Sequence, residues 1–309
     1  MAVMSEDKSR LQRLFEAGEF AVTGEIGPPK GADASSVLKA AEELNGIIDA
    51  ANVTDNQTSI LRMSSIAGSL LAQSKGVEAV VQMTCRDRNR IAIQSDLLGA
   101  WALGLRNLLL LSGDHQCFGN DPQSKNVYDV DSVQIIKMMT DLQNNGVFYN
   151  GKKAKGAPQF FIGTTANPFA DPMELQLIRL KKKIQAGAKF VQTQSIYDID
   201  KFEEWMEKVR EMGLHKQAYI QAGVMVNKSV RSIEATQNVP GMSIPDALIE
   251  RMKKAEDPKE EGVAIVLEII ERVKKIEGVS GLHVMAVGWE AIVPVVVQRA
   301  GFSPRPTLN

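Results

Sequence analysis

The sequence alternates eight times between a short apolar run and a longer stretch with helical spacing of apolar residues. The apolar runs cover residues 20–26, 47–53, 79–83, 107–111, 159–162, 189–191, 217–226 and 282–287. The helical stretches cover residues 35–44, 59–74, 90–103, 133–142, 173–186, 201–212, then 228–237, 245–255 and 260–275, and finally 290–299. Because a helical stretch separates each apolar run from the next, the pattern predicts a parallel sheet.

Eight such units in a chain of 309 residues favour a closed barrel. We therefore predict an α/β fold, a single (β/α)8 TIM barrel over residues 1–309, with a short N-terminal helix at residues 5–17. The alternative is an open doubly wound sheet, which is expected to carry G-x-G-x-x-G after its first strand. The first run ends instead in Gly24-Glu25-Ile26-Gly27-Pro28-Pro29.

Charge and composition narrow the class of protein. The net charge is -1 and no stretch is densely basic, so we expect no nucleic-acid partner. The first 13 residues are polar, and no apolar run approaches the roughly 18 residues of a membrane span. Two cysteines, Cys85 and Cys117, provide neither a disulfide framework nor a zinc site. We expect a cytoplasmic protein without a membrane span.

Polar side chains gather at the predicted carboxyl ends of the strands, where barrels of this kind carry their chemistry. These residues are Glu25, Thr54, Asp55, Thr84, Asp114, Asn167 and Gln194. Strand ends are usually polar because the loops that follow them face water, and this is sufficient to explain Thr54 and Asn167. It explains Asp114, directly after four leucines and a glycine, and Gln194 less well. A carboxyl group in a partly apolar pocket can act as a general acid near neutral pH, so Glu25 and Asp114 are the acid and base candidates for a small polar substrate.

The histidines and Lys183 carry no clear sequence signal of a catalytic or metal-binding role. The three histidines, His115, His215 and His283, have no ligand spacing, so we predict no metal site and interpret each as an ordinary surface or core residue. Lys183 ends a run of three lysines on a predicted helix, a pattern that usually marks a solvated face.

An ordered set of motifs, spread over nearly the whole chain, resembles the methylenetetrahydrofolate reductase family. The motifs are Glu25-Ile26-Gly27-Pro28-Pro29-Lys30, Val53-Thr54, Met83-Thr84-Cys85, Leu111-Ser112-Gly113-Asp114, the run from Leu180 to Ala188, Thr193-Gln194, Tyr197-Asp198 and His283. The set is far more specific than any one of its members.

The resemblance implies a flavin-bearing barrel that reduces 5,10-methylenetetrahydrofolate to 5-methyltetrahydrofolate. In the family, the acid at the Glu25 position protonates N10 of the folate and opens the five-membered ring, and hydride then comes from reduced flavin. The acid at the Asp114 position lies near the flavin and the pterin, and the Gln194 position binds folate. The resemblance assigns cofactor contacts to Thr54, Gln82, Thr84, Ser112, Asp114, Asn167 and Lys183.

The chain departs from the family in ways that bear on the cofactor and the electron donor. Many members carry His at position 82 and Arg at position 112, where this chain has Gln82 and Ser112. A lost cation near the phosphates makes FMN an alternative to FAD. After the eighth strand, Met285-Ala286-Val287-Gly288-Trp289 lacks the common aromatic and Asn-containing pattern, so direct use of NADH or NADPH is in doubt.

The chain looks most like the catalytic subunit of acetogenic bacteria, which implies an iron-sulfur and zinc partner subunit as electron source and an oligomeric assembly. Two cysteines cannot supply a four-cysteine cluster. A second hypothesis is a folate-binding or scaffold subunit without flavin chemistry, and a third is a flavin-free pterin methyltransferase barrel.

Overall fold

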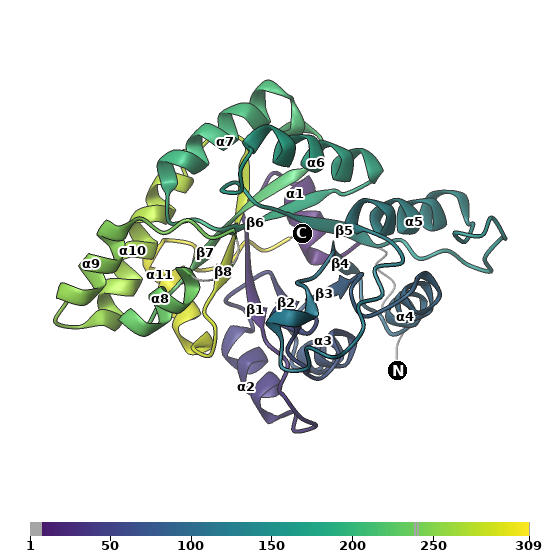
Figure 1. The fold of residues 1–309 in the computed structure, drawn as a ribbon, viewed down its shortest axis with the longest axis horizontal. Coiled ribbons are helices and arrows are strands. Elements are labelled where there is room, and N and C mark those ends of the chain that lie inside the picture. The colour runs from purple at the N-terminus through teal and green to yellow at the C-terminus, as the bar shows by residue number, and fades with distance from the viewer. Residues whose placement is uncertain (1–7, 238, 240, 309) are drawn as a thin grey trace.

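The computed structural model describes residues 8–237, 239 and 241–308. Within this part, eight parallel strands pair in sequence order, and the last pairs with the first, so the sheet closes into a barrel (Figure 1). The strands are β1 (Ala21–Ile26), β2 (Ala50–Val53), β3 (Ala79–Thr84), β4 (Asn107–Leu111), β5 (Phe161–Ala166), β6 (Phe190–Ser195), β7 (Tyr219–Met225) and β8 (Val279–Met285). The predicted (β/α)8 TIM barrel is confirmed.

Helices surround the barrel (Figure 1). They are α1 (Arg10–Glu16), α2 (Ser35–Leu44), α3 (Ser65–Ser74), α4 (Arg90–Ala102), α5 (Ser132–Asn145), α6 (Met173–Ala186), α7 (Ile199–Glu211), α8 (Val230–Gln237), α9 (Asp246–Lys254), α10 (Pro258–Val273) and α11 (Val293–Arg299). Short 3-10 turns are η1 (Gln57–Ser59), η2 (Gln116–Phe118), η3 (Leu214–Lys216) and η4 (Glu290–Ile292). Helix α7, for example, buries Phe202, Trp205, Met206 and Val209 at helical spacing.

Several predicted boundaries were wrong. Strand β5 runs four residues beyond its predicted end and β6 likewise, whereas β8 starts three residues earlier than predicted. Thr164 and Thr165 continue β5 because β-branched residues suit strands, and the Thr164 hydroxyl donates to the Leu110 carbonyl at 3.0 Å. A polar residue therefore does not end a strand when the barrel itself supplies its hydrogen-bond partner.

Helices α1 and α3 begin later than predicted. The stretch at 59–74 becomes helical only at Ser65, because Thr58 and Ser59 have positive φ angles of 55° and 56° and Ser64 caps the helix. The N-terminal helix predicted at 5–17 is α1, which begins at Arg10 with Ser9 as its cap, and residues 5–7 lie outside the described part.

Helix α1 closes the end of the barrel at which the strands begin. Its Leu11 and Phe15 form a buried cluster with strand residues that include Phe161 and Phe190, the first residues of β5 and β6. The Phe161 and Phe190 rings stack with centroids 5.0 Å apart. With this end filled by side chains, the opposite end is left as the place for a ligand.

Candidate active site

A cavity of about 900 Å³ opens at the carboxyl ends of the strands. Most of the predicted site residues line it, from β1, β3, the β4 end, the β5 end, α6 and β6. They are Glu25, Gln82, Ser112, Asp114, Asn167, Lys183 and Gln194. Glu25, Asp114 and Gln194 thus share one cavity, as the strand assignment predicted.

Glu25 occupies the fifth position of β1, where its side chain is only 10% exposed. The Gln57 amide Nε2 donates to Glu25 Oε1 at 3.3 Å, and His283 Nε2 lies 3.9 Å from Oε2. Within the described part of the chain, no lysine or arginine forms an ion pair with this carboxylate. The Glu25 carboxyl group is therefore largely enclosed, with an amide and an imidazole as its polar neighbours.

A layer of polar side chains beneath the cavity holds His283 in place. Its Nδ1 lies 3.0 Å from the Thr23 hydroxyl, which Gln221 Nε2 also approaches at 3.2 Å. Gln192 lies between Asn52 and Gln221: it exchanges hydrogen bonds with the Asn52 amide and donates from Nε2 to Gln221 Oε1. His283 is buried, which agrees with one of its two predicted settings, a core position, and its Nε2 faces Glu25.

Asp114 follows β4 and presents an exposed side chain to the cavity. Gly113 before it has a φ of 85°, and a Cβ on Gly113 would lie 3.0 Å from Thr84 Cβ. Only glycine suits both the left-handed backbone and this close packing. The tight turn at Gly113 therefore places Asp114 at the rim.

Gln194 is exposed although it lies within β6 rather than after it. Its neighbours Thr193 and Ser195 are buried, as alternation along a strand requires. The side chain of Gln194 therefore points into the mouth of the barrel, where it is available to a ligand.

The residues predicted to contact a cofactor fall into two groups. Gln82 and Ser112 line the cavity with side-chain polar groups that have no hydrogen-bond partner in the described part of the chain. Asn167 is engaged: its Nδ2 donates to the Gly241 carbonyl at 3.1 Å, and its Oδ1 accepts from Phe169 N at 2.9 Å. Gln82 and Ser112 are therefore the free polar groups of this wall.

Lys183 contradicts its interpretation as part of a solvated face. It is 9% exposed, lines the cavity and donates from Nζ to the Thr165 carbonyl at 2.7 Å. Burial, reinforced by the positive charge of Arg179, lowers the pKa of Lys183 to about 8. The physical reason is helical phase: position 183 lies on the same inward face of α6 as the buried Leu180 and Ile184.

Thr54 and Thr84 do not line the cavity in the described structure. Both are buried, and the Thr84 hydroxyl donates to Asp55 Oδ2 at 2.9 Å. Asp55 in turn binds the Arg88 guanidinium at 2.7 Å, so this carboxylate of the predicted rim ties loops together. The cofactor contacts assigned to Thr54 and Thr84 stay predictions.

Sequence reasoning missed several cavity residues. Gln192, Arg179, Lys228 and Trp289 all line the cavity. Gln192 stands directly after the predicted apolar strand and beside Gln194, which could have marked it. Arg179 and Lys228 carried no signal in the sequence that separates them from surface cations.

Within the residues described, no group of three or more His, Cys, Asp or Glu side chains is arranged to hold a metal ion. The same residues contain no helix that is both long and apolar enough to cross a membrane.

Comparison with known proteins gives consistent matches over the barrel. The family model described as methylenetetrahydrofolate reductase matches residues 10–301. A probable methylenetetrahydrofolate reductase (NADPH) of Caenorhabditis elegans is 27% identical over 309 residues, which covers 94% of this chain and 44% of the relative. Methylenetetrahydrofolate reductase 1 of Schizosaccharomyces pombe is 26% identical, covering 73% of this chain and 36% of the relative. The chain thus spans less than half the length of these two relatives.

Shorter relatives and solved structures also match. The 5,10-methylenetetrahydrofolate reductase of Pectobacterium carotovorum is 22% identical, covering 69% of this chain and 66% of the relative. Among solved structures, an uncharacterised protein from Clostridium thermocellum that binds two copies of 5-methyl-5,6,7,8-tetrahydrofolic acid superposes with a TM-score of 0.70. It is 15% identical and covers 94% of this chain and 99% of its own, which shows a shared fold.

Proposed function

The chain belongs to the methylenetetrahydrofolate reductase family, and from this premise we propose that it reduces 5,10-methylenetetrahydrofolate to 5-methyltetrahydrofolate with the help of a bound flavin. The observation that carries the proposal is the shared cavity: Glu25, Asp114 and Gln194 come from three different strand ends and line one space. A cavity of about 900 Å³ can hold two flat ring systems.

Glu25 is the proposed general acid. Its carboxyl group donates a proton to N10 of the folate, which breaks the bond from N10 to the bridging carbon and leaves a 5-iminium cation. The neutral surroundings of Glu25 suit this task, because the proton is held by a group without a competing cation. His283, held by Thr23, would position the carboxyl group.

Asp114 and Gln194 are proposed to bind and stabilise the substrate. The carboxylate of Asp114 accepts no hydrogen bond and forms no ion pair in the described part of the chain, so its charge is available to the cation that forms. A fixed negative charge near a developing positive charge is a strong source of rate enhancement in an enclosed site. Gln194 can donate and accept hydrogen bonds at the polar edge of the folate.

The walls of the cavity fit a flavin. The ring system needs donors for its carbonyl groups and a cation for its phosphate, and Gln82, Ser112, Lys183 and Arg179 offer these at the β3, β4 and α6 side. When bound, reduced flavin supplies a hydride to the exocyclic carbon of the substrate. Because Gln82 and Ser112 carry no charge, we propose that FMN or FAD is held mainly through Lys183 and Arg179.

We also propose a partner subunit as the electron source. Burial raises the pKa of the Cys85 thiol to about 12, and Cys117 is the second cysteine of the chain. Two cysteines cannot supply the four thiolate ligands of a cluster, so the ligands of an iron-sulfur centre would come from outside residues 1–309.

The absorption spectrum of the purified protein, before and after reconstitution with FMN or FAD, tests the flavin. We expect the two visible bands of a bound oxidised flavin. Tight binding of 5-methyltetrahydrofolate without flavin binding or turnover would instead favour a folate-binding or scaffold subunit. Absence of both ligands would contradict the proposed function.

A further inference from the structure

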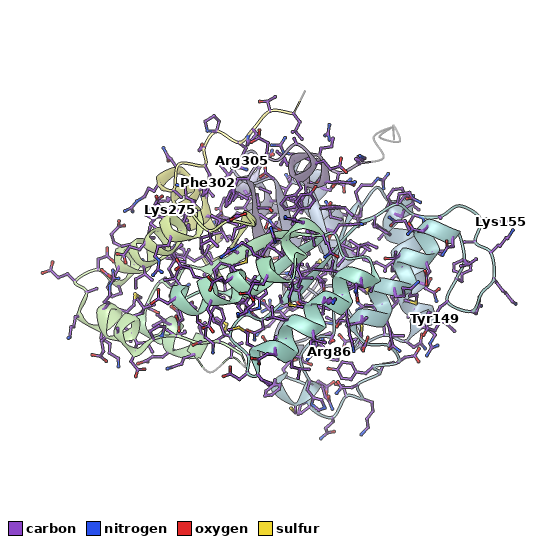
Figure 2. The ribbon with its side chains drawn as sticks, turned by 90° about the horizontal axis from the view of Figure 1, so that it is seen from above. Arg86, Tyr149, Lys155, Lys275, Phe302 and Arg305 are labelled. Carbon is purple, nitrogen blue, oxygen red and sulfur yellow. The ribbon has the colours of Figure 1, made fainter. Side chains whose placement is uncertain are left out.

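A buried arginine lies between the loops that carry the predicted site residues. Arg86, labelled in Figure 2, lies in the loop after β3. It is 1% exposed and is among the largest fully buried side chains of the described residues. Buried arginines need partners for all their donors, and the partners of Arg86 come from three loops.

The guanidinium group bridges two neighbouring strand ends. Its NH1 donates to the backbone carbonyl of Asp114 at 3.1 Å, and its NH2 donates to the carbonyl of Asn56 at 3.2 Å. Asn56 follows β2 and Asp114 follows β4, so one side chain from the β3 loop holds the loops on both sides.

The charge of Arg86 is neutralised by its neighbour in sequence. Asp87 accepts from Arg86 Nε at 2.7 Å and from NH2 at 2.6 Å, a two-point ion pair. Arg86 therefore contacts the backbone of Asp114 and leaves the Asp114 carboxylate unpaired. The arrangement fixes the position of a negative charge without cancelling it.

A second contact holds the preceding peptide group, between Gly113 and Asp114. The Tyr128 hydroxyl donates to the Gly113 carbonyl at 3.1 Å, and Tyr128 N donates to the Cys85 carbonyl at 3.2 Å. Tyr128 has a φ of 39°, in the left-handed region that bulky residues seldom adopt. Both ends of the β4–α5 loop are thus fastened to the β3 loop that carries Arg86.

We propose that Arg86 is a positioning residue, a charge-neutral clamp that sets the place of the Asp114 carboxylate in the cavity. The functional part of this inference rests on the proposed role of Asp114 in folate reduction. A displacement of reacting groups by about 1 Å can lower a rate by about 100-fold, so a clamp on the backbone of Asp114 is expected to matter.

The test is a double-mutant cycle with Asp114→Asn. We expect Arg86→Met to lower kcat/KM for 5,10-methylenetetrahydrofolate by about tenfold or more in the wild-type background, chiefly through kcat, and to have little further effect in the Asp114→Asn background. Arg86→Lys, which keeps the charge but replaces the guanidinium fork by a single ammonium group, should give an intermediate loss and guards against failure of the methionine variant to fold.

Arg90→Met is the matched control. Arg90 forms a two-point ion pair with Asp129 near the far end of the same β4–α5 loop and does not line the cavity. Its effect on kcat/KM should be small and additive with Asp114→Asn. Additive effects of Arg86→Met and Asp114→Asn would overturn the clamp.

Crystal structures of the variants give a second readout that does not depend on activity. We expect the Asp114 backbone to move in Arg86→Met and to stay in Arg90→Met. An unmoved Asp114 in the Arg86 variant would contradict the inference. If the wild-type protein does not turn over the folate, the proposed function fails, and the crystal structures alone decide the clamp.

Discussion

The two ends of the barrel use carboxylates in opposite ways. At the end closed by α1, Asp49 accepts from Val22 N at 2.8 Å and from the Arg10 and Arg305 guanidinium groups at 3.0 and 2.6 Å. Glu78 nearby accepts from Arg10 N and Leu11 N at 2.6 and 2.9 Å and so caps α1. At the open end, neither Glu25 nor Asp114 forms an ion pair with a lysine or arginine of the described residues.

The difference indicates that the carboxylates at the closed end stabilise the fold, whereas those at the open end are available for chemistry. Arg305 and Arg86 lie on opposite sides of the molecule in Figure 2. They differ in how they contact Asp49 and Asp114, the aspartates at the two ends of the barrel. Arg305 pairs with the carboxylate of Asp49, whereas Arg86 holds only the backbone of Asp114. A carboxylate that the protein leaves without a partner, beside a large cavity, is one that a ligand can use.

Substitution of Glu25 should give the largest effect and would sharpen this comparison. We expect Glu25→Gln to lower the rate of folate reduction by about 10²- to 10⁴-fold, because the amide cannot supply the proton to N10. Reduction of the bound flavin by an artificial donor should stay close to the wild-type rate, and the free energy of unfolding should change by less than about 0.5 kcal/mol. Equal loss of both half-reactions would remove Glu25 from the acid role.

The reciprocal change at the closed end should affect stability alone. Asp49→Ala leaves Arg10 and Arg305 without their common carboxylate, and breaking a buried ion pair costs about 3–5 kcal/mol. Asp96→Ala is the control, because Asp96 is 41% exposed in its pair with Arg88 and should cost about 1 kcal/mol or less. Urea unfolding measures the loss of stability in both variants. An Asp49→Ala variant that folds but no longer reduces the folate would contradict the division of roles between the two ends.

A smaller effect is expected from the pH dependence of flavin binding. Burial lowers the pKa of Lys183 to about 8, so its amine loses its charge as the pH rises through this value. Because an anionic ligand favours the protonated amine, the affinity for FMN should fall above pH 8, by about tenfold if binding raises the pKa by about one unit. Lys183→Met should abolish this dependence. An unchanged profile in the variant, followed by flavin fluorescence, would place the titrating group elsewhere.

The alternation of apolar runs was sufficient to predict the barrel and the rim, because both depend on local pattern and on the rule that parallel strands share one carboxyl end. Glu25, Asp114 and Gln194 were found in this way. Lys183 was misjudged because a run of three lysines hides which one faces inward; only the packed phase of α6 shows it.

Arg86 and His283 escaped residue-level reasoning for a related reason. Each depends on partners that are distant in sequence, such as Asp114 for Arg86 and Thr23 for His283. A sequence pattern gives the residue type at a strand end. It does not give the partners that turn an ordinary polar residue into a clamp or a neighbour of the acid.

The most direct test of the central claim is an anaerobic single turnover. The protein, reconstituted with flavin and reduced by dithionite, is mixed with 5,10-methylenetetrahydrofolate while the flavin absorbance and the folate products are followed. We expect the oxidised flavin bands to return with formation of an equal amount of 5-methyltetrahydrofolate. A flavin that stays reduced while the folate binds would contradict the account.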